Sequence, residues 1–273
     1  MSVDERFMQL ALEAARQGEG LTRPNPPVGA VLVREEVVLA TGWHAVAGGD
    51  HAERACLNAV AGEDLSGSTL YITLEPCSTY GRTPPCSAFI LEHQLQRVVV
   101  GTLDPNPVHA GRGIEQLKES GVEVSVGVCE EDARCLIEPF VSWMVRRRPF
   151  VTLKLAVTLD GRMADAAGSS KWISGGAARE WVQGLRRKVD AVMVGAETVR
   201  RDDPSLLPRP AEGRSPWRII MGEDIPDEAC VVSDEAADRT LIRTGELGPV
   251  LASLAADYDV MHLLCEGGGG VAA

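Results

Sequence analysis

Three side chains that can bind a metal ion stand where predicted strands give way to predicted helices. A fold that uses them together must bring these distant junctions to one point. His51 opens a predicted helix, Cys77 follows a predicted strand, and Cys86 comes shortly before another predicted helix. Zinc binds imidazole and thiolate groups, and catalytic zinc sites have three protein ligands and one open position. We therefore predict a zinc site formed by His51, Cys77 and Cys86.

Glu53 follows His51 so closely that it cannot readily bind the same ion, but its carboxylate can reach a water molecule on that ion. His-x-Glu followed later by Pro-Cys is the pattern of zinc deaminases, in which the glutamate moves protons and is not a ligand. We predict Glu53 as the catalytic residue of a zinc-dependent deaminase. The remaining cysteines fall in helical or strand patterns and are predicted to fill the core: Cys56, Cys129, Cys135, Cys230 and Cys265.

Strands alternate with helices along the chain, which predicts an α/β layered fold. The first helix is expected to be capped by Asp4. Expected helices are Asp4–Gln17, Ala52–Ala61, Ser87–Leu95, Ile114–Ser120 and Ala177–Val189. Expected strands are Val28–Leu32, Val37–Thr41, Thr69–Leu74, Arg97–Gly101, Val122–Val128, Phe150–Val157, Ala191–Gly195, Trp217–Met221 and Tyr258–Cys265.

The length and one short segment indicate two domains. At roughly 100–200 residues per domain, a chain of this length suggests two domains or one large one. A boundary is expected near Met144–Pro149, because three consecutive arginines run into a proline, which breaks helices. We predict a deaminase domain at 1–146 and a second domain at 150–273.

Charge and cysteine content exclude some functions. The net charge is −12 and neither predicted domain is basic, so a nucleic-acid partner is not expected. The sequence has neither an apolar run near the roughly 18 residues of a membrane span nor an N-terminal signal-peptide pattern. The 7 cysteines are an odd number and are expected to be reduced thiols, which favours a cytoplasmic protein.

The segment between the two cysteines resembles one family. Zinc deaminases with a short Pro-Cys-x-x-Cys have two residues there, whereas this chain has the insert Ser78–Pro85 (STYGRTPP). That insert is similar to the one in bifunctional riboflavin biosynthesis proteins, which fuse a pyrimidine deaminase to a uracil reductase. Further segments resemble the same family: Pro24–Gly29, Asp104–Pro107, Gly111–Gly113, Lys154–Gly161, Lys171–Ser174, Thr198–Leu206 and Glu266–Gly268.

The resemblance covers nearly the whole chain. It implies an N-terminal cytidine-deaminase-like three-layer domain followed by a dihydrofolate-reductase-like α/β domain. For the first domain it implies Zn²⁺-dependent hydrolytic deamination of a small molecule, a diaminopyrimidinone carrying a ribosylamino phosphate (the ribotide). Asn25, His44 and Arg82 match substrate-binding positions, with Arg82 suited to a phosphate. Asp104–Pro107 is expected to be a turn and not part of the site.

For the second domain the resemblance implies reduction of the ribosyl chain of the deaminated product to a ribityl chain, with NADPH as the reductant. The positions that match substrate contacts are Lys154, Ser170, Arg186, Leu206, Arg209 and Glu266. The positions that match cofactor contacts are Ala156, Trp172, Ser174, Thr198, Asp202, Gly267 and Gly268.

Two features depart from the family pattern. Gly222-Glu223 stands where the family usually has an aspartate and a small hydroxyl residue near the cofactor. The chain also stops at Ala273, so the second domain is expected to be truncated, without the strands that flank the Glu266 strand and usually build a dimer interface. A homo-oligomer is expected if the full reductase domain is present.

Several alternatives stay open at this point. The reductase could be a non-functional remnant beside a working deaminase. The first domain could belong to another deaminase that acts on cytosine, cytidine or a tRNA adenosine, but the acidic charge opposes tRNA and the insert opposes the others. A zinc-stabilised binding module would not need Glu53 beside its ligands. A dehydrogenase of the nucleotide-binding fold is excluded because no G-x-G-x-x-G follows the first predicted strand.

Overall fold

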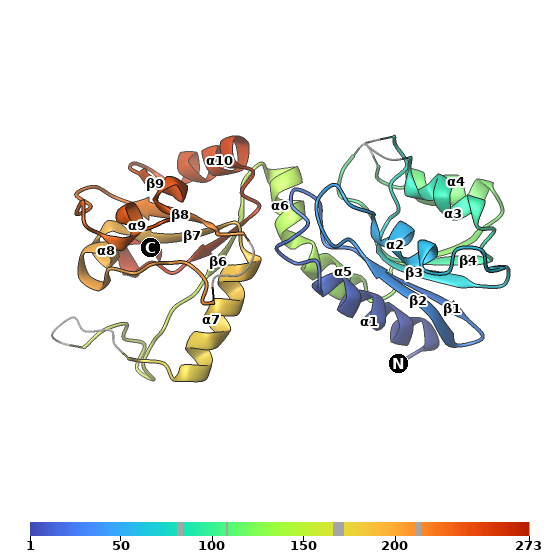
Figure 1. Ribbon diagram of the computed structural model, residues 1–273, viewed down its shortest axis with the longest axis horizontal. Helices are drawn as coiled ribbons and strands as arrows, with labels where there is room; N and C mark the ends of the chain where they lie inside the picture. Colours follow the sequence, from blue (N-terminus) through green and yellow to red (C-terminus); the bar gives the residue numbers. More distant parts are fainter. Residues whose placement is uncertain (81–83, 108, 166–171, 211–213, 273) are drawn as a thin grey trace. The chain divides into compact units, whose positions relative to one another are not determined.

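The computed structural model of the protein describes residues 1–80, 84–107, 109–165, 172–210 and 214–272. The chain folds into two compact units, Met1–Val145 and Arg146–Ala273. Each unit contains one five-stranded sheet (Figure 1). Within the described ranges, no helix is long and apolar enough to cross a lipid bilayer.

The sheet of the first unit has the strand order β2-β1-β3-β4-β5. The strands are β1 (Gly29–Arg34), β2 (Val37–Trp43), β3 (Thr69–Leu74), β4 (Arg97–Thr102) and β5 (Glu123–Val126). β1 pairs antiparallel with β2 and β3, whereas β3, β4 and β5 run parallel to one another. The parallel pairs matter for the site, because their carboxyl ends lie at one edge of the sheet.

Helices cover both faces of this sheet, so the first unit has three layers. Its helices are α1 (Val3–Arg16), α2 (Ala52–Asn58), α3 (Cys86–Glu92), α4 (Arg112–Glu119), α5 (Glu130–Leu136) and α6 (Glu138–Arg146). Alternate residues of β3 face opposite layers: Leu70 and Ile72 pack in the core formed with α2, α3 and α4, and Tyr71 packs against α1 and α5. Helices α5 and α6 were not expected from the sequence.

Helix α1 begins differently from the prediction. Ser2, not Asp4, caps it: the Ser2 side chain accepts the Glu5 N–H, and the Glu5 carboxylate accepts the Ser2 N–H. Asp4 instead accepts two bonds of 2.8 Å from the Arg97 guanidinium at the start of β4. This pairing lowers the pKa of Asp4 and fastens α1 to the sheet.

The sheet of the second unit is entirely parallel, with the strand order β6-β10-β7-β8-β9. Its strands are β6 (Phe150–Leu153), β7 (Ala191–Gly195), β8 (Trp217–Met221), β9 (Thr240–Arg243) and β10 (His262–Cys265). Its helices are α7 (Gly176–Lys188), α8 (Ala196–Asp202), α9 (Cys230–Ser233), the 3₁₀ turn η1 (Ala237–Arg239), α10 (Leu247–Tyr258) and α11 (Gly269–Ala272). Side chains of α7 and α8 pack on one face and those of α10 on the other, which again makes three layers.

The expectation that strands flanking the Glu266 strand are missing is wrong. Glu266 directly follows β10, and β10 is paired on both sides, by β6 and by β7. Strand β6 is also shorter than predicted, because its ladder with β10 ends at Leu153 and Cys265. Tyr258 belongs to α10 and not to a strand. Helices α8, α9, α10 and α11, the turn η1 and strand β9 were not expected from the sequence.

The prediction that all five remaining cysteines fill the core is also wrong in part. Cys56 and Cys265 are buried, Cys129 and Cys230 are half-buried, and Cys135 is exposed. Cys135 lies near the end of α5, a helix that was not expected from the sequence, so its solvent-facing position could not be inferred.

Substitution of Gly29 tests how closely α1 packs on the sheet. A Cβ at this position would lie 2.1 Å from the Ala11 carbonyl oxygen and 2.6 Å from the Ala15 nitrogen, so Gly29→Ala must push α1 outward. Overpacking of this kind costs about 1–3 kcal/mol. We expect a lower urea midpoint for Gly29→Ala by circular dichroism. Gly184→Ala in α7 is the control, because its Cβ would meet nothing within 4 Å; a wild-type midpoint for Gly29→Ala would contradict this packing.

Candidate active sites of the two units

The first candidate site lies at the carboxyl ends of two parallel strands. Leu74 of β3 is opposite Thr102 of β4, so the segments 75–77 and 104–106 leave the sheet at the same edge. The starts of α2 and α3 complete the site, since His51 precedes α2 and Cys86 is the first residue of α3. A cavity of about 250 Å³ opens among these segments.

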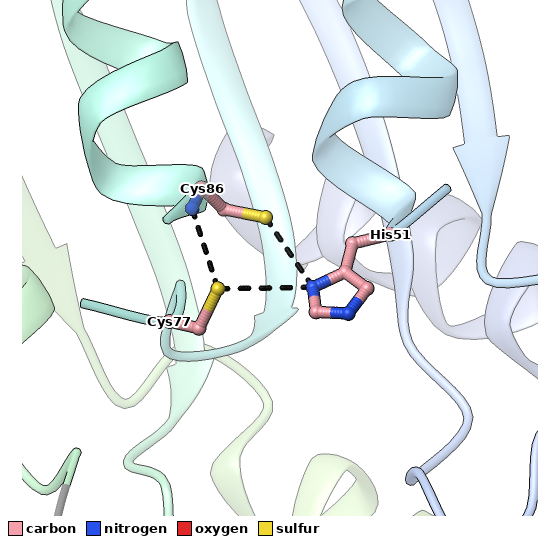
Figure 2. A group of neighbouring side chains, drawn as sticks. All are labelled: His51, Cys77 and Cys86. Carbon is pink, nitrogen blue, oxygen red and sulfur yellow. Dashed lines mark hydrogen bonds between the residues drawn. The ribbon is translucent and has the colours of Figure 1, made fainter. Parts of the chain in front are cut away.

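The three predicted metal ligands meet at this edge (Figure 2). The Nδ1 atom of His51 is 3.8 Å from the Cys77 Sγ and 3.4 Å from the Cys86 Sγ. All three ligand atoms lie within 4.8 Å of one another. The Cys86 backbone N–H donates to the Cys77 Sγ at 3.3 Å, which favours negative charge on that sulfur.

The geometry of this cluster fits tetrahedral zinc. Zinc bonds of about 2.3 Å to sulfur and about 2.0–2.1 Å to nitrogen put a sulfur and a nitrogen ligand about 3.6 Å apart. The observed nitrogen–sulfur separations of 3.8 and 3.4 Å lie on either side of that value. The donor set contains three protein atoms, which leaves one tetrahedral position for a water molecule or a substrate.

Glu53 lies in the first turn of α2 and lines the same cavity. Its side chain is buried, and burial raises the pKa of its carboxyl; negative charge on Cys77 raises it further. A carboxyl whose pKa is raised holds a proton more readily at neutral pH. That property suits a group that must take up a proton and give it back.

Asn25 and His44, two predicted substrate contacts, are neighbours on the cavity wall. Burial lowers the pKa of His44, so its ring is neutral at neutral pH. The Nδ1–H of His44 donates to the Asp50 carbonyl oxygen at 2.8 Å, and Nε2 then accepts from the Asn25 amide nitrogen at 3.1 Å. This network fixes which way the Asn25 amide points. The third predicted contact, Arg82, lies outside the described residues.

The segment after β4 was expected to be only a turn, but it also contributes to the site. Asp104, Asn106 and His109 line the cavity. The turn itself is present, because the Asn106 N–H donates to the Asp104 carboxylate at 2.8 Å. Burial raises the pKa of Asp104. Its place directly after a strand parallel to β3 was a signal that could have identified it.

An apolar wall of the cavity also escaped prediction. It comes from Phe140, Trp143 and Met144 of α6. Their spacing places them on one side of a helix, which was a usable signal, but the helix itself was not predicted.

The second candidate site lies at the carboxyl ends of β6, β10 and β7, three neighbouring parallel strands. A cavity of about 820 Å³ opens there. Its lining includes every predicted reductase residue except Ser170, which lies outside the described residues: Lys154, Ala156, Trp172, Ser174, Arg186, Thr198, Asp202, Leu206, Arg209, Glu266, Gly267 and Gly268. Residues predicted separately from five segments of sequence therefore share one cavity.

An ion-pair network joins three of these residues. The Arg186 guanidinium binds the Glu266 carboxylate through two bonds, of 2.6 and 3.1 Å, and also donates to the Leu207 carbonyl oxygen at 3.2 Å. The Lys154 ammonium lies 3.9 Å from the same carboxylate. Glu266 thus sets the positions of two cations that line the cavity.

Aromatic and small residues form other parts of the wall. The Arg179 guanidinium lies over the Trp172 ring, 4.4 Å from its centroid, and donates to the Ser174 carbonyl oxygen at 2.6 Å. Gly267 packs against Val271, and a Cβ on Gly267 would lie 2.8 Å from the Val271 Cβ. A larger residue would force this part of the wall to move.

The departure at Gly222 has a structural reason. Its φ is +124°, and an added Cβ would lie 2.9 Å from the Ala196 Cβ, so glycine suits this position. The Arg200 guanidinium holds the turn by donating to the Glu223 and Asp224 carbonyl oxygens at 2.9 and 3.3 Å. These residues are absent from the described lining of the large cavity.

Each of the two units matches a known protein family. Residues 1–102 match the family described as the cytidine and deoxycytidylate deaminase zinc-binding region, and residues 149–273 match the RibD C-terminal domain. These matches place a cytidine-deaminase-like domain first and a RibD reductase domain second in an α/β fold.

Relatives and solved structures are similar over nearly the whole chain. The riboflavin biosynthesis protein RibD of Aquifex aeolicus is 43% identical over 97% of this chain and 81% of its own length. RibD of Mycobacterium tuberculosis is 43% identical over 98% of this chain and 79% of its own length.

Two solved structures share the fold. One, from Thermotoga maritima, is a diaminohydroxyphosphoribosylaminopyrimidine deaminase/5-amino-6-(5-phosphoribosylamino)uracil reductase. It is 41% identical with a TM-score of 0.87, covering 98% of this chain and 82% of that one. RibD of Acinetobacter baumannii is 37% identical with a TM-score of 0.87 and the same coverage. From these matches and the geometry of both sites, the chain belongs to the RibD family of bifunctional riboflavin biosynthesis proteins.

Proposed function

We propose that this protein performs two consecutive steps of riboflavin biosynthesis, each in one unit. The first unit deaminates the diaminopyrimidinone ribotide, and the second, with a dihydrofolate-reductase-like sheet, reduces the ribosyl chain of the product. The observation that carries the proposal is the convergence of His51, Cys77 and Cys86 beside the buried Glu53. A binding module stabilised by zinc would have no use for a buried carboxyl at that place.

In the first unit, His51, Cys77 and Cys86 would hold zinc, which when bound supplies a water molecule of lowered pKa as the nucleophile. Glu53 takes a proton from the attacking water and delivers it to the ring nitrogen. The water oxygen bonds to the ring carbon that carries the amine. Glu53 then carries the second proton to the amine, the carbon–nitrogen bond breaks, and ammonia leaves. Asn25 and the neutral His44 bind the pyrimidine edge.

In the second unit the cavity volume of about 820 Å³ is within the range of sites for small molecules and cofactors, about 300–1,000 Å³. NADPH, when bound there, would supply a hydride to the ribosyl carbon that carries the amine. The bond from that carbon to the ring oxygen breaks, and the oxygen takes up a proton. Ala156, Trp172, Ser174, Thr198, Asp202, Gly267 and Gly268 would hold the cofactor. Lys154, Arg186, Leu206, Arg209 and Glu266 would hold the substrate, with Ser170 and, in the first unit, Arg82 as contacts carried over from the family.

The direct test is incubation of the protein with the ribotide, with ammonia release and NADPH consumption followed separately. Both are expected, and NADPH consumption should depend on prior deamination. Ammonia release without NADPH consumption would support the alternative of a deaminase with a reductase remnant. Absence of both from zinc-replete protein would contradict the proposal.

The metal assignment predicts the zinc content of cysteine variants. Wild-type protein should bind about one zinc ion per chain, because the three ligand atoms form one tetrahedral set. Cys77→Ser and Cys86→Ser should each lower the zinc content measured by elemental analysis. Cys135→Ser is the matched control, since this exposed thiol is not in the cluster and its loss should leave zinc unchanged. If both Cys77→Ser and Cys86→Ser kept the wild-type zinc content, these cysteines would not be zinc ligands.

The proton-transfer role predicts the behaviour of Glu53→Gln. The amide has nearly the shape of the carboxyl but cannot carry a proton, so ammonia release should fall by about 10²–10⁴-fold while zinc is retained. NADPH consumption with substrate that has already been deaminated should stay at the wild-type rate in the same sample. Ammonia release near the wild-type rate would exclude Glu53 from the mechanism.

The ion pair in the second unit predicts that Arg186→Lys impairs reduction and leaves deamination intact. Lysine keeps the charge but cannot reproduce the two parallel bonds to Glu266. Misplacement of the Glu266 carboxylate should lower NADPH turnover by about 10²-fold. Ammonia release serves as the internal control and should be unaffected. Wild-type NADPH turnover would show that this network does not position the substrate.

A further inference from the structure

We propose that Glu75 is a positioning residue for deamination: its carboxylate holds both ends of the segment 104–113 and so places Asp104, Asn106 and His109 in the deaminase cavity. The inference rests on the function proposed for that cavity. Glu75 is the residue after β3, two positions before Cys77, and its side chain is buried at 3% exposure.

Three backbone N–H groups, all from one segment distant in sequence, donate to this carboxylate. The Oε2 atom accepts from Asp104 at 3.2 Å and from Gly111 at 2.9 Å, and the Oε1 atom accepts from Gly113 at 3.1 Å. Asp104 opens the segment, and Gly111 and Gly113 close it at the start of α4. One side chain therefore fixes the separation between the two ends.

The end of the segment at Gly113 packs closely against Pro76, which directly precedes the predicted metal ligand Cys77. A Cβ on Gly113 would lie 2.1 Å from the Pro76 carbonyl oxygen, so the backbone there has no spare room. Gly111 has a φ of +82° and offers no side chain to cap α4. Glu75 supplies that missing cap from another element, since a negative group is favourable at a helix start.

Between these ends the segment presents its polar side chains to the substrate space. Asp104, Asn106 and His109 line the cavity that also contains His51, Cys77 and Glu53. Only Pro76 separates Glu75 from Cys77. The end of β3 therefore positions both a predicted metal ligand and, through Glu75, the cavity wall that contains Asp104, Asn106 and His109. The Oε2 atom alone joins the two ends, and the Oε1 atom adds a second bond at the α4 end, so accepting all three N–H groups takes both oxygens of a carboxylate.

Glu75→Gln tests the inference with little change of shape. Whichever way the amide turns, its NH₂ group faces at least one of the three N–H donors. Turned toward Asp104 and Gly111 it breaks the tie between the two ends, and turned toward Gly113 it sets two donors against each other at the start of α4. With the ribotide as substrate we expect KM to rise by about tenfold or more and kcat to change by less than about threefold, because the segment contacts substrate and not the reacting proton. Zinc content should stay at the wild-type value.

Gln116→Ala is the matched control. Gln116 accepts from the Ser87 hydroxyl at 2.7 Å and so makes another tie between α3 and α4, away from the segment 104–113. If loosening α4 in general weakened binding, this variant would also raise KM. We expect its KM to match that of the wild type.

A double-mutant cycle with Asn106→Ala separates positioning from a general loss of stability. If Glu75 acts through the segment, the double variant should have a KM no higher than that of the worse single variant. Multiplicative effects, an unchanged KM in Glu75→Gln, or loss of zinc from that variant would each overturn the inference. A wild-type protein that releases no ammonia would instead refute the proposed function, and the inference with it.

Discussion

The register between β3 and β4 is the constraint on which the deaminase site depends. Leu74 pairs with Thr102 in a parallel ladder, and this pairing brings the chain after each strand to the same edge of the sheet. One segment carries Cys77 and the other carries Asp104 and Asn106. A shift of one residue in this register would turn alternate side chains to the other face and separate these groups. The site is thus a consequence of how two buried apolar strands pair.

In the second unit, too, neighbouring parallel strands bring the site residues together. Lys154 and Glu266 leave the ends of β6 and β10, which are paired up to Leu153 and Cys265. Neighbouring strand ends bring the two charges within 3.9 Å of each other, and Arg186 from α7 completes the network. Because the described lining residues of each cavity all belong to one unit, a change in one set of residues should leave the other reaction intact.

Sequence alone predicted the parts of the sites that lie in short local patterns. His51 and Glu53 are neighbours on one helix start, and the Cys77–Cys86 insert is specific to a family. It missed Trp143, because that contact depends on α6, a helix that was not expected although its apolar spacing was a usable signal. Nor could it place β10 between β6 and β7, since strand order is a long-range property that periodicity does not encode. The cap at Ser2 was missed although its pattern was local.

Two buried glutamates in the deaminase cavity have different surroundings, and the difference fits the separate roles proposed for them. The oxygens of Glu75 accept three backbone N–H groups, so its carboxylate is committed to holding a segment in place. Burial dominates the surroundings of Glu53 and raises the pKa of its carboxyl, so that carboxyl can be protonated and deprotonated during a reaction. Carboxyl groups in one site commonly divide their roles in this way, through their environments. A carboxylate satisfied by backbone donors is suited to ordering the wall, as proposed for Glu75, and a desolvated one is suited to moving the proton, as proposed for Glu53.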